Sequence, residues 1–340
     1  MTAMPRRATI LALAVAAVLF ETTAATPQQP VPDLRVLVLT KTDGFRHSSI
    51  PSAVQALRDL GAQNGFAVDA TDDSGVFTDA NLERYAVVAF ALTAGNVLDD
   101  VQQAAFQRYI RSGHGFVGLH SASDTERSWP WYRRLVGASF RSHPAIQKAT
   151  LDVADRRHLS TERLPRRWTR TDEWYNFARN PRRSVRVLVT LDERTYAPGD
   201  GAMGRDHPIA WAHEFDGGRA WYTGGGHTEE SYSEPLFRAH LLGGVRYAAG
   251  LAPPSILSTA TTLRARRVVV AVRYADCRRC AARISVRLPG RRLAVPMRLV
   301  GGRARATTPA LPAGRWTLVI TVENRANGRK TVVRRSVLIR

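Results

Sequence analysis

Cysteine is scarce in this chain of 340 residues. Its two cysteines lie together in Cys277-Arg-Arg-Cys280, so the first 276 residues contain none. That absence excludes a thiolate nucleophile from most of the chain, and two cysteines alone cannot complete a structural zinc site. The residues on either side of the pair are typical of strands, whereas a redox pair would follow a strand and open a helix. We therefore expect a local disulfide, with free thiols as the alternative.

Long apolar runs are also rare. The one at residues 8–20 follows Arg6 and Arg7 and is too short to span a bilayer comfortably. A basic start, an apolar stretch and the small residues of Thr23-Ala-Ala25 predict a secretory signal peptide over residues 1–25, with an uncleaved anchor as the alternative. We expect a linker at residues 26–33 and a protein that is secreted or associated with the cell envelope.

Acidic residues are almost missing from the last quarter of the chain. Residues 255–340 hold 20 lysines and arginines but only Asp276 and Glu323 as acids, so they carry +18 of the formal net charge of +20. Such a stretch often binds nucleic acid, but the expected export argues against that partner. An anionic cell-wall polymer or anionic lipid headgroups would use the same electrostatics. A basic, solvated surface without a partner is the alternative.

Strand and helix patterns alternate through the first third of the chain. Apolar strand-like runs are separated by short connections and amphipathic helices, which predicts a doubly wound parallel sheet. The expected strands are 34–39, 66–71, 86–91 and 115–119, and the expected helices are 50–60, 78–84 and 99–111. Less regular strand patterns follow, and a closing helix is expected at 234–249.

The C-terminal part has a different pattern. After a Pro-containing linker at 251–256, alternating runs separated by Gly-rich turns are typical of a small all-β, immunoglobulin-like sandwich. We expect this basic β-sandwich domain to occupy residues 257–340, with strands at 267–274, 282–288, 293–300, 316–322 and 331–339.

Polar side chains gather where the expected strands end. The strand 115–119 stops at His120, and the carboxyl ends of strands are where ligands bind in open α/β sheets. Four other segments add polar groups in loops or at strand ends. These segments are 43–47, 140–144, 171–175 and 222–227. Of Asp172 and Glu173, we expect one side chain to point inward and the other to be solvated, and we favour Glu173 as the inward one.

The order of these segments resembles the ThuA-like (trehalose utilisation) family of the class I glutamine-amidotransferase-like superfamily. The similar motifs are Phe-Arg-His after the first strand, Gly-Leu-His with a following Trp-Pro-Trp-Tyr, Gly-Ala-Ser-Phe-x-x-His-Pro, Asp-Glu-Trp-Tyr, His-Pro-Ile-Ala-Trp, and Gly-Arg-Ala-Trp-Tyr-Thr before Gly-His. The resemblance covers residues 34–250. It implies a flavodoxin-like, doubly wound three-layer sandwich and a connection with sugar utilisation. Relatives of this fold keep a nucleophilic cysteine where this chain has His120, so amidotransferase activity by the usual route is excluded.

The polar cluster allows two chemical interpretations. In the first, a divalent metal such as zinc is bound by several of His47, His120, His143, Glu173 and His227, because imidazole and carboxylate groups suit such ions. The metal would activate water or polarise a sugar carbonyl. In the second, no metal is present, and Glu173 acts with a histidine, His120 or His227, as general acid and base. No nucleotide cofactor is expected, because no dinucleotide fingerprint occurs.

The remaining candidate residues would contact a sugar. Hydrogen bonds with Asp43, Arg46, His47 and His143 would hold its hydroxyl groups. The aromatic rings of Trp129, Trp131, Trp174 and Tyr175 would lie against its apolar faces. The leading hypothesis is an exported protein that hydrolyses or isomerises a carbohydrate or sugar derivative. The alternative is a non-catalytic glycan-binding or envelope-associated protein on a degenerate amidotransferase-like fold.

Overall fold

The computed structural model describes residues 34–252, 254–275, 280–288, 291–324 and 329–340. The expected signal peptide at 1–25, the linker at 26–33 and Cys277 lie outside these residues. Cys280 is disulfide-bonded. Among the described residues, every helix is too short or too polar to cross a membrane.

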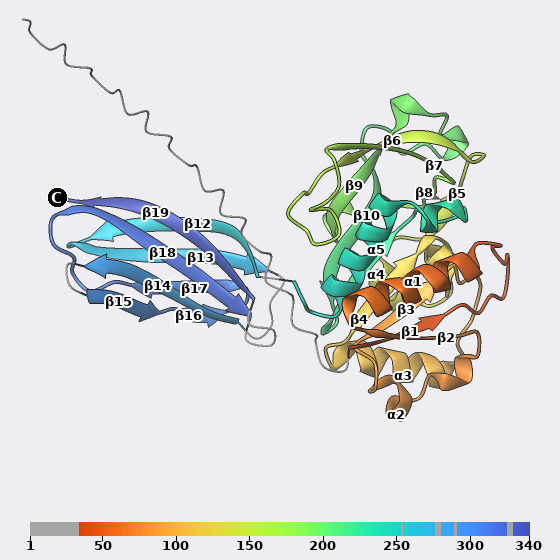
Figure 1. The fold of residues 1–340 in the computed structure, drawn as a ribbon, viewed down its shortest axis with the longest axis horizontal. Coiled ribbons are helices and arrows are strands. Elements are labelled where there is room, and N and C mark those ends of the chain that lie inside the picture. The colour runs from red at the N-terminus through yellow and green to blue at the C-terminus, as the bar shows by residue number, and fades with distance from the viewer. Residues whose placement is uncertain (1–33, 253, 276–279, 289–290, 325–328) are drawn as a thin grey trace, which may run out of the picture. The chain divides into compact units, whose positions relative to one another are not determined.

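A nine-stranded sheet forms the centre of the α/β part, in the order β2-β1-β3-β4-β11-β10-β9-β6-β7 (Figure 1). The first five strands are parallel: β2 Ala67–Thr71, β1 Arg35–Leu39, β3 Val87–Ala91, β4 Gly115–Leu119 and β11 Gly218–Thr223. The other four are antiparallel to their neighbours: β10 His207–Phe215, β9 Arg186–Asp192, β6 Gln147–Val153 and β7 Arg167–Asp172. β3 and β4 are buried along their whole length, as expected for parallel strands covered on both faces.

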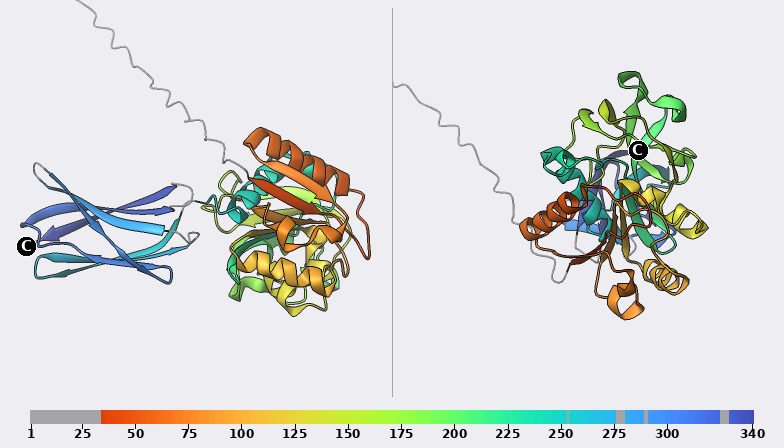
Figure 2. Two further views of the ribbon diagram at one scale, coloured as in Figure 1. Left: turned by 90° about the horizontal axis from the view of Figure 1, so that it is seen from below. Right: turned by 90° about the vertical axis from the view of Figure 1, so that its right-hand side faces the viewer.

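Helices cover both faces of this sheet. They are α1 Ile50–Asn64, α2 Asp79–Leu82, α3 Asp100–Arg111, α4 Pro130–Val136 and α5 Pro235–Ala248. α1 contacts α5 and lies opposite α3 (Figure 2). α1 extends beyond the expected residue 60 because its left-handed C-terminal cap is Gly65, with φ +74°. α3 begins with a capping box in which the Asp99 carboxylate accepts from the Gln102 N–H.

Shorter elements connect these helices and strands. β5 Phe140–Ser142 pairs with β8 Asn176–Phe177 outside the large sheet. Single 3₁₀ turns complete the connections: η1 Ser74–Val76, η2 His120–Asp124, η3 Pro181–Arg183, η4 Glu193–Thr195, η5 Gly199–Gly201 and η6 Glu230–Tyr232.

The C-terminal part consists of two four-stranded antiparallel sheets (Figure 1). One contains β12 Ser255–Arg264, β13 Arg267–Ala275, β17 Arg303–Thr307 and β16 Arg298–Val300. The other contains β15 Arg291–Pro296, β14 Cys280–Leu288, β18 Gly314–Asn324 and β19 Lys330–Ile339. Their inward-facing side chains, among them Val270, Ile284 and Ile320, form a hydrophobic core separate from that of the α/β part.

Two details of this part differ from the sequence-based expectation. The run 293–300 is two strands rather than one, since β15 pairs with β14 and β16 pairs with β17 of the other sheet. The chain changes sheet at Met297, which is buried and whose N–H is bonded to the Ala282 carbonyl. β12 also begins at Ser255, inside the expected linker 251–256.

Close packing of α5 on β11 holds the strand that leads to His227. A Cβ placed on Gly244 would lie 2.4 Å from the Trp221 ring of β11. Trp221 is fully buried and its indole donates to the Ser160 hydroxyl, so the ring has little room to retreat. Only glycine fits at this helix position.

Gly244→Ala should therefore destabilise the protein by about 1–3 kcal/mol through overpacking, although alanine is the better helix former. Urea unfolding of the single variant, of Trp221→Phe and of the double variant measures the effect. Because the two residues touch, the double variant should lose less than the sum of the single losses. Unchanged or increased stability of Gly244→Ala would contradict this view of the α5–β11 contact.

Candidate functional site

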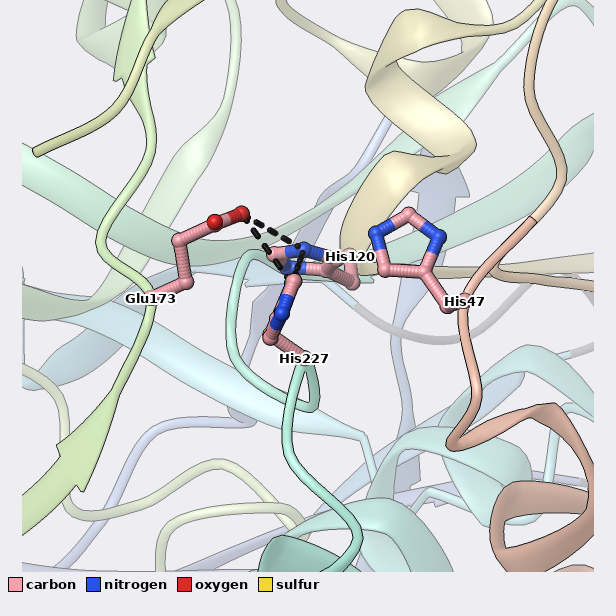
Figure 3. Close-up of side chains that lie close together, drawn as sticks. All are labelled: His47, His120, Glu173 and His227. Carbon is pink, nitrogen blue, oxygen red and sulfur yellow. Dashed lines mark hydrogen bonds and ion pairs between the residues drawn. The ribbon is translucent and has the colours of Figure 1, made fainter. Parts of the chain in front are cut away.

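Four side chains from distant segments meet at one edge of the large sheet (Figure 3). His47 lies in the loop after β1, His120 directly follows β4, and His227 follows β11. These strands are parallel, so their carboxyl ends share an edge. Four antiparallel steps separate β7 from β11, so β7 runs in the same direction and delivers Glu173 to that edge. The sequence-based expectation that ligand-type residues gather at strand ends thus describes the observed arrangement.

Three atoms in this cluster form a small triangle. The Glu173 Oε2 atom lies 3.3 Å from His120 Nε2 and 3.1 Å from His227 Nδ1. His120 Nε2 lies 3.2 Å from His227 Nδ1. Each residue, together with His47, offers one ligand-type atom within 4.8 Å of the others. The side chain of His120 is fully buried and that of Glu173 is 8% exposed, so the triangle is largely shielded from water.

His120 is held in a fixed orientation. Its φ of +49° lies in the left-handed region, which non-glycine residues rarely adopt. Its Nδ1 is 2.8 Å from the Gly224 carbonyl, which can only accept, so the Nδ1 atom carries a proton. The Tyr222 hydroxyl donates to the His120 carbonyl from the other side. A neutral His120 therefore presents the lone pair of Nε2 to Glu173 and His227.

His47 completes the cluster as a neutral ring. Its ring centre is 5.0 Å from those of both His120 and His227, in edge-on orientation. Burial, followed by the neighbouring histidines His120 and His227, lowers the pKa of His47 to about 3. Its Nδ1 is buried without a hydrogen-bond partner among the described residues. An unpaired buried nitrogen is costly unless something binds it.

The charges on Glu173 and His227 stabilise each other. Burial alone would raise the pKa of Glu173, but hydrogen bonds with His120 and His227 outweigh burial and lower the pKa to about 2. Burial likewise opposes a charged His227, yet the hydrogen bond and charge of Glu173 raise the pKa of His227 above its usual value. Without another cation, Glu173 is a carboxylate and His227 is the group that carries the compensating proton.

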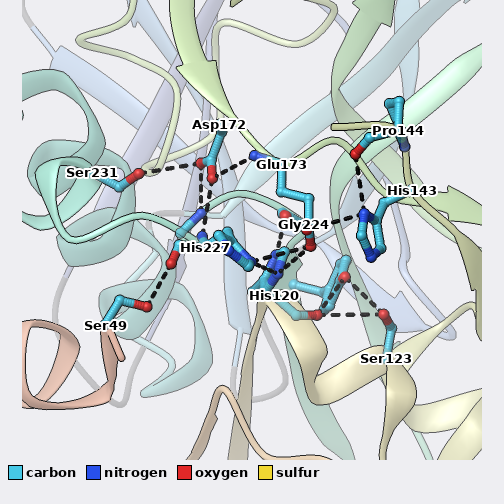
Figure 4. Close-up of polar contacts among 12 residues, drawn as sticks. Ser49, His120, Ser123, His143, Pro144, Asp172, Glu173, Gly224, His227 and Ser231 are labelled. Carbon is cyan, nitrogen blue, oxygen red and sulfur yellow. Dashed lines mark hydrogen bonds and ion pairs between the residues drawn. The ribbon is translucent and has the colours of Figure 1, made fainter. Parts of the chain in front are cut away.

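Asp172 anchors two of these residues through their backbones (Figure 4). Its Oδ1 accepts from the N–H groups of Glu173, at 2.9 Å, and His227, at 3.0 Å. Its Oδ2 accepts from the Gly226 N–H at 2.7 Å and pairs with Arg170 at 2.6 Å. The expectation that either Asp172 or Glu173 is solvated is wrong, because both are buried. Buried and exposed residues alternate along β7, and the buried ones are Trp168, Arg170 and Asp172. The sequence did not reveal this alternation, because arginines lie on both faces of the strand.

The other candidate residues fall into three groups. His143, 42% exposed, lies with its Nδ1 3.0 Å from Glu173 Oε1, and the Tyr175 ring packs 4.0 Å from that of His120, so both belong to the cluster. Asp43 and Arg46 are exposed in the loop that carries His47. Trp129 stacks on Trp131, whose indole donates to Asp216 at the opposite edge of the sheet. The structure does not bring Trp129 to the cluster.

Phe45 is a further residue at this edge that the sequence analysis did not single out. Its side chain is 68% exposed although it is a large hydrophobic group. The ring meets that of His47 edge-on at 4.8 Å. Phe45 is part of the motif Phe-Arg-His. The sequence alone does not distinguish it from a phenylalanine of the core, whereas its exposure in the fold does.

The geometry of the triangle fits a metal ion. Ligands about 2.0–2.1 Å from a tetrahedral zinc ion lie about 3.3–3.4 Å from one another, close to the observed 3.1–3.3 Å. His120, Glu173 and His227 supply two imidazoles and one carboxylate, a donor set common in catalytic sites. Asp172 and the Gly224 carbonyl would then be the outer groups that orient these ligands.

Replacing Asp172 with Asn should weaken zinc binding by the full chain at least about tenfold. The amide can accept on one side only, and its NH₂ group would face the Gly226 N–H and Arg170. Competition with a chromophoric chelator measures the affinity. Asp192→Asn is the matched control, because Asp192 is also a buried, arginine-paired carboxylate but lies at the end of β9. Equal affinities of the two variants would show that Asp172 does not position the cluster.

The metal-free protein should have a defined pH dependence at this site. The lowered pKa of Glu173 stabilises the fold above about 4.5 and this stabilisation is lost as the pH falls toward 2. The raised pKa of His227 stabilises the fold below about 6.5 and this stabilisation is lost as the pH rises through its folded value. Both contributions are present together between about pH 4.5 and 6.5.

Glu173→Gln removes this pair, so in EDTA its loss of stability should be greatest near pH 5–6, on the order of 1–3 kcal/mol. The loss should shrink at pH 3 and at pH 8.5. Urea unfolding across that range measures it, with the exposed-carboxylate variant Glu230→Gln as the control. A loss that is independent of pH would exclude the charged pair.

Comparison with known proteins agrees with the motifs. The family model described as trehalose utilisation, ThuA, matches residues 35–248. A ThuA-like protein from Bacteroides uniformis is 22% identical, with a TM-score of 0.56 over 66% of this chain and 94% of its own. One from Parabacteroides merdae is 19% identical, with a TM-score of 0.53 over 64% of this chain and 90% of its own. No curated protein matches. The mixed α/β part, with its large central sheet, belongs to the ThuA family.

Proposed function

We propose that this protein is a divalent-metal-dependent member of the ThuA family that acts on a carbohydrate or sugar derivative. The observation that carries the proposal is the triangle of His120 Nε2, His227 Nδ1 and Glu173 Oε2, with edges of 3.1–3.3 Å. The lone pairs of three such atoms repel one another unless a hydrogen or a metal ion lies between them. A hydrogen on His227 Nδ1 is one possibility, and a metal ion is the other.

His47 favours the metal. A proton shared within the triangle does not explain why a fourth neutral imidazole is buried beside three ligand-type groups. With its pKa lowered to about 3, His47 presents a free lone pair at neutral pH. Four such donors from four strand ends are typical of a metal centre rather than of an acid–base pair.

The groups around the triangle suit a sugar. When bound, a divalent metal would supply Lewis-acid polarisation of a carbonyl or hydroxyl oxygen, or a water of lowered pKa. His143, half exposed and bonded to Glu173, lies where it can donate to or accept from a substrate hydroxyl. Phe45 offers an exposed ring face beside His47, while Asp43 and Arg46 offer charged hydrogen-bonding groups on the same loop. The family description, trehalose utilisation, supports the same substrate class.

The proposal also includes a flavodoxin-like α/β part, an immunoglobulin-like C-terminal sandwich and export of the protein. The parallel order β2-β1-β3-β4-β11 supports a flavodoxin-like, doubly wound arrangement, and the two C-terminal sheets support an immunoglobulin-like sandwich. The N-terminal sequence supports export. The alternative is a non-catalytic glycan-binding protein, in which the same side chains hold a sugar without converting it.

Metal analysis of the purified full chain tests the proposal. We expect about one divalent ion per chain, lost in His120→Ala and in Glu173→Gln and retained in His114→Ala, which removes a histidine outside the cluster. Incubation with trehalose and other disaccharides, followed by NMR of the products, should show conversion that chelation abolishes. Failure to bind any divalent metal would overturn the metal centre. Metal-dependent sugar binding without conversion would establish the non-catalytic alternative.

A further inference from the structure

The C-terminal sandwich carries an unusual arrangement of arginines on one face. In the sheet β12-β13-β17-β16, six exposed arginines point to the same side: Arg264, Arg267, Arg273, Arg298, Arg303 and Arg305. The residues that alternate with them, including Val268, Val272 and Ala304, are buried in the core. We call the outward side of this sheet the arginine face.

All six arginines stand in directly opposed cross-strand pairs. Arg264 of β12 faces Arg267 of β13, Arg273 of β13 faces Arg303 of β17, and Arg298 of β16 faces Arg305 of β17. Neighbouring strands are about 4.8 Å apart, so like charges are held close together. Directly opposed like charges destabilise a sheet. Three such pairs on one face are not what stability alone would produce.

No acidic residue in the described part of the sandwich compensates these charges. Among its described residues the acid is Glu323, which pairs with Lys330 of β19 in the other sheet. None of the six arginines forms an ion pair or side-chain hydrogen bond within the described part of the chain. The guanidinium groups are therefore free to bind an external anion, which arginine does in a bidentate geometry.

The arginine face is also hollowed. A groove of about 440 Å³ is lined by Arg273, Arg303 and Arg305, with the hydroxyls of Ser258 and Thr262 along β12. Arg303 and Arg305 are two residues apart on one strand, which separates their stems by about 6.7 Å. The face thus offers a ladder of arginines whose stems are about 5–7 Å apart, beside hydrogen-bonding hydroxyls.

We infer that the arginine face binds a linear anionic polysaccharide. Regularly spaced carboxylates match the ladder, and the sugar hydroxyls match Ser258 and Thr262. Nucleic acid is a poorer match, because no aromatic side chain lies on this face among the described residues to stack a base. A lipid surface is a poorer match too, because interfacial binding also needs apolar side chains that insert, and Val300, at the β16 edge, is the large exposed one here. The inference rests on the sandwich alone and does not depend on the proposed metal centre.

Binding of the full chain to immobilised polygalacturonate tests the inference, with neutral dextran as the uncharged control. We expect binding to polygalacturonate, weakened by salt, and none to dextran. Arg303→Gln/Arg305→Gln should weaken it at least tenfold. Arg315→Gln/Arg334→Gln removes the same charge from the exposed outer face of the other sheet and should weaken it less than threefold.

The outcomes are decisive. Equal losses in the two double variants would show attraction to net charge only and would overturn the arginine face as a site. Absence of binding to polygalacturonate, or tighter binding to phosphatidylglycerol vesicles or to a 30-nucleotide single strand at the same salt, would overturn the anionic polysaccharide as its partner. The melting temperature of Arg303→Gln/Arg305→Gln should be unchanged or higher, since the variant relieves like-charge repulsion. A lower melting temperature would contradict the strain on which the inference depends.

Discussion

The buried pair of Arg170 and Asp172 is the interaction on which the candidate site depends. Both belong to β7, the last strand of the sheet, yet their partners lie after β11, in its middle. Arg170 bonds Ser231 and Glu234, and Asp172 bonds the backbone of Gly226 and His227. The sheet therefore curls until its end meets the loop after its centre. Without that closure, Glu173 and His227 would not belong to one cluster.

A buried ion pair gains little unless every remaining polar atom is satisfied. Here the Arg170 guanidinium bonds two carboxylates and a hydroxyl and lies over the rings of Trp168, Trp174 and Phe237. The Asp172 carboxylate accepts from three backbone N–H groups. This network binds the backbone of the loop 224–227 at Gly226 and His227. The hydrogen bonds from the backbone of Glu173 and His227 to Asp172 thus set the orientation of these two side chains.

Much of the architecture follows from local pattern, whereas the site depends on contacts that no local pattern encodes. The strands β1, β3 and β4 and the helix α3 could be predicted from the sequence, because hydrophobic period and length agree in each of them. β7 was not predicted, since its arginines, which lie on both faces of the strand, resemble a solvated segment. Only the fold shows that Arg170 lies between two carboxylates. His120 could be chosen because it follows an expected strand, and Glu173 and His227 because they lie in segments that gather polar groups. Asp172 was misjudged, because its role comes from Gly226 and His227, more than 50 residues away. Trp129 was chosen for its residue type, and its stacking on Trp131 depends on packing that only the fold defines.

The turn after β4 determines what the side chain at position 120 can do. His120 occupies a strand end with φ +49°, and the backbone there is held by Tyr222 and by the pairing of its ring with Gly224. A side chain at such a turn projects into the site whatever its chemistry. A thiol there would attack a substrate, whereas an imidazole with its Nδ1 proton committed to a carbonyl can only offer the Nε2 lone pair. The backbone fixes where the group acts, and the residue fixes whether it is a nucleophile or a ligand. The presence of Glu173 and His227 within 3.3 Å of that lone pair favours the ligand.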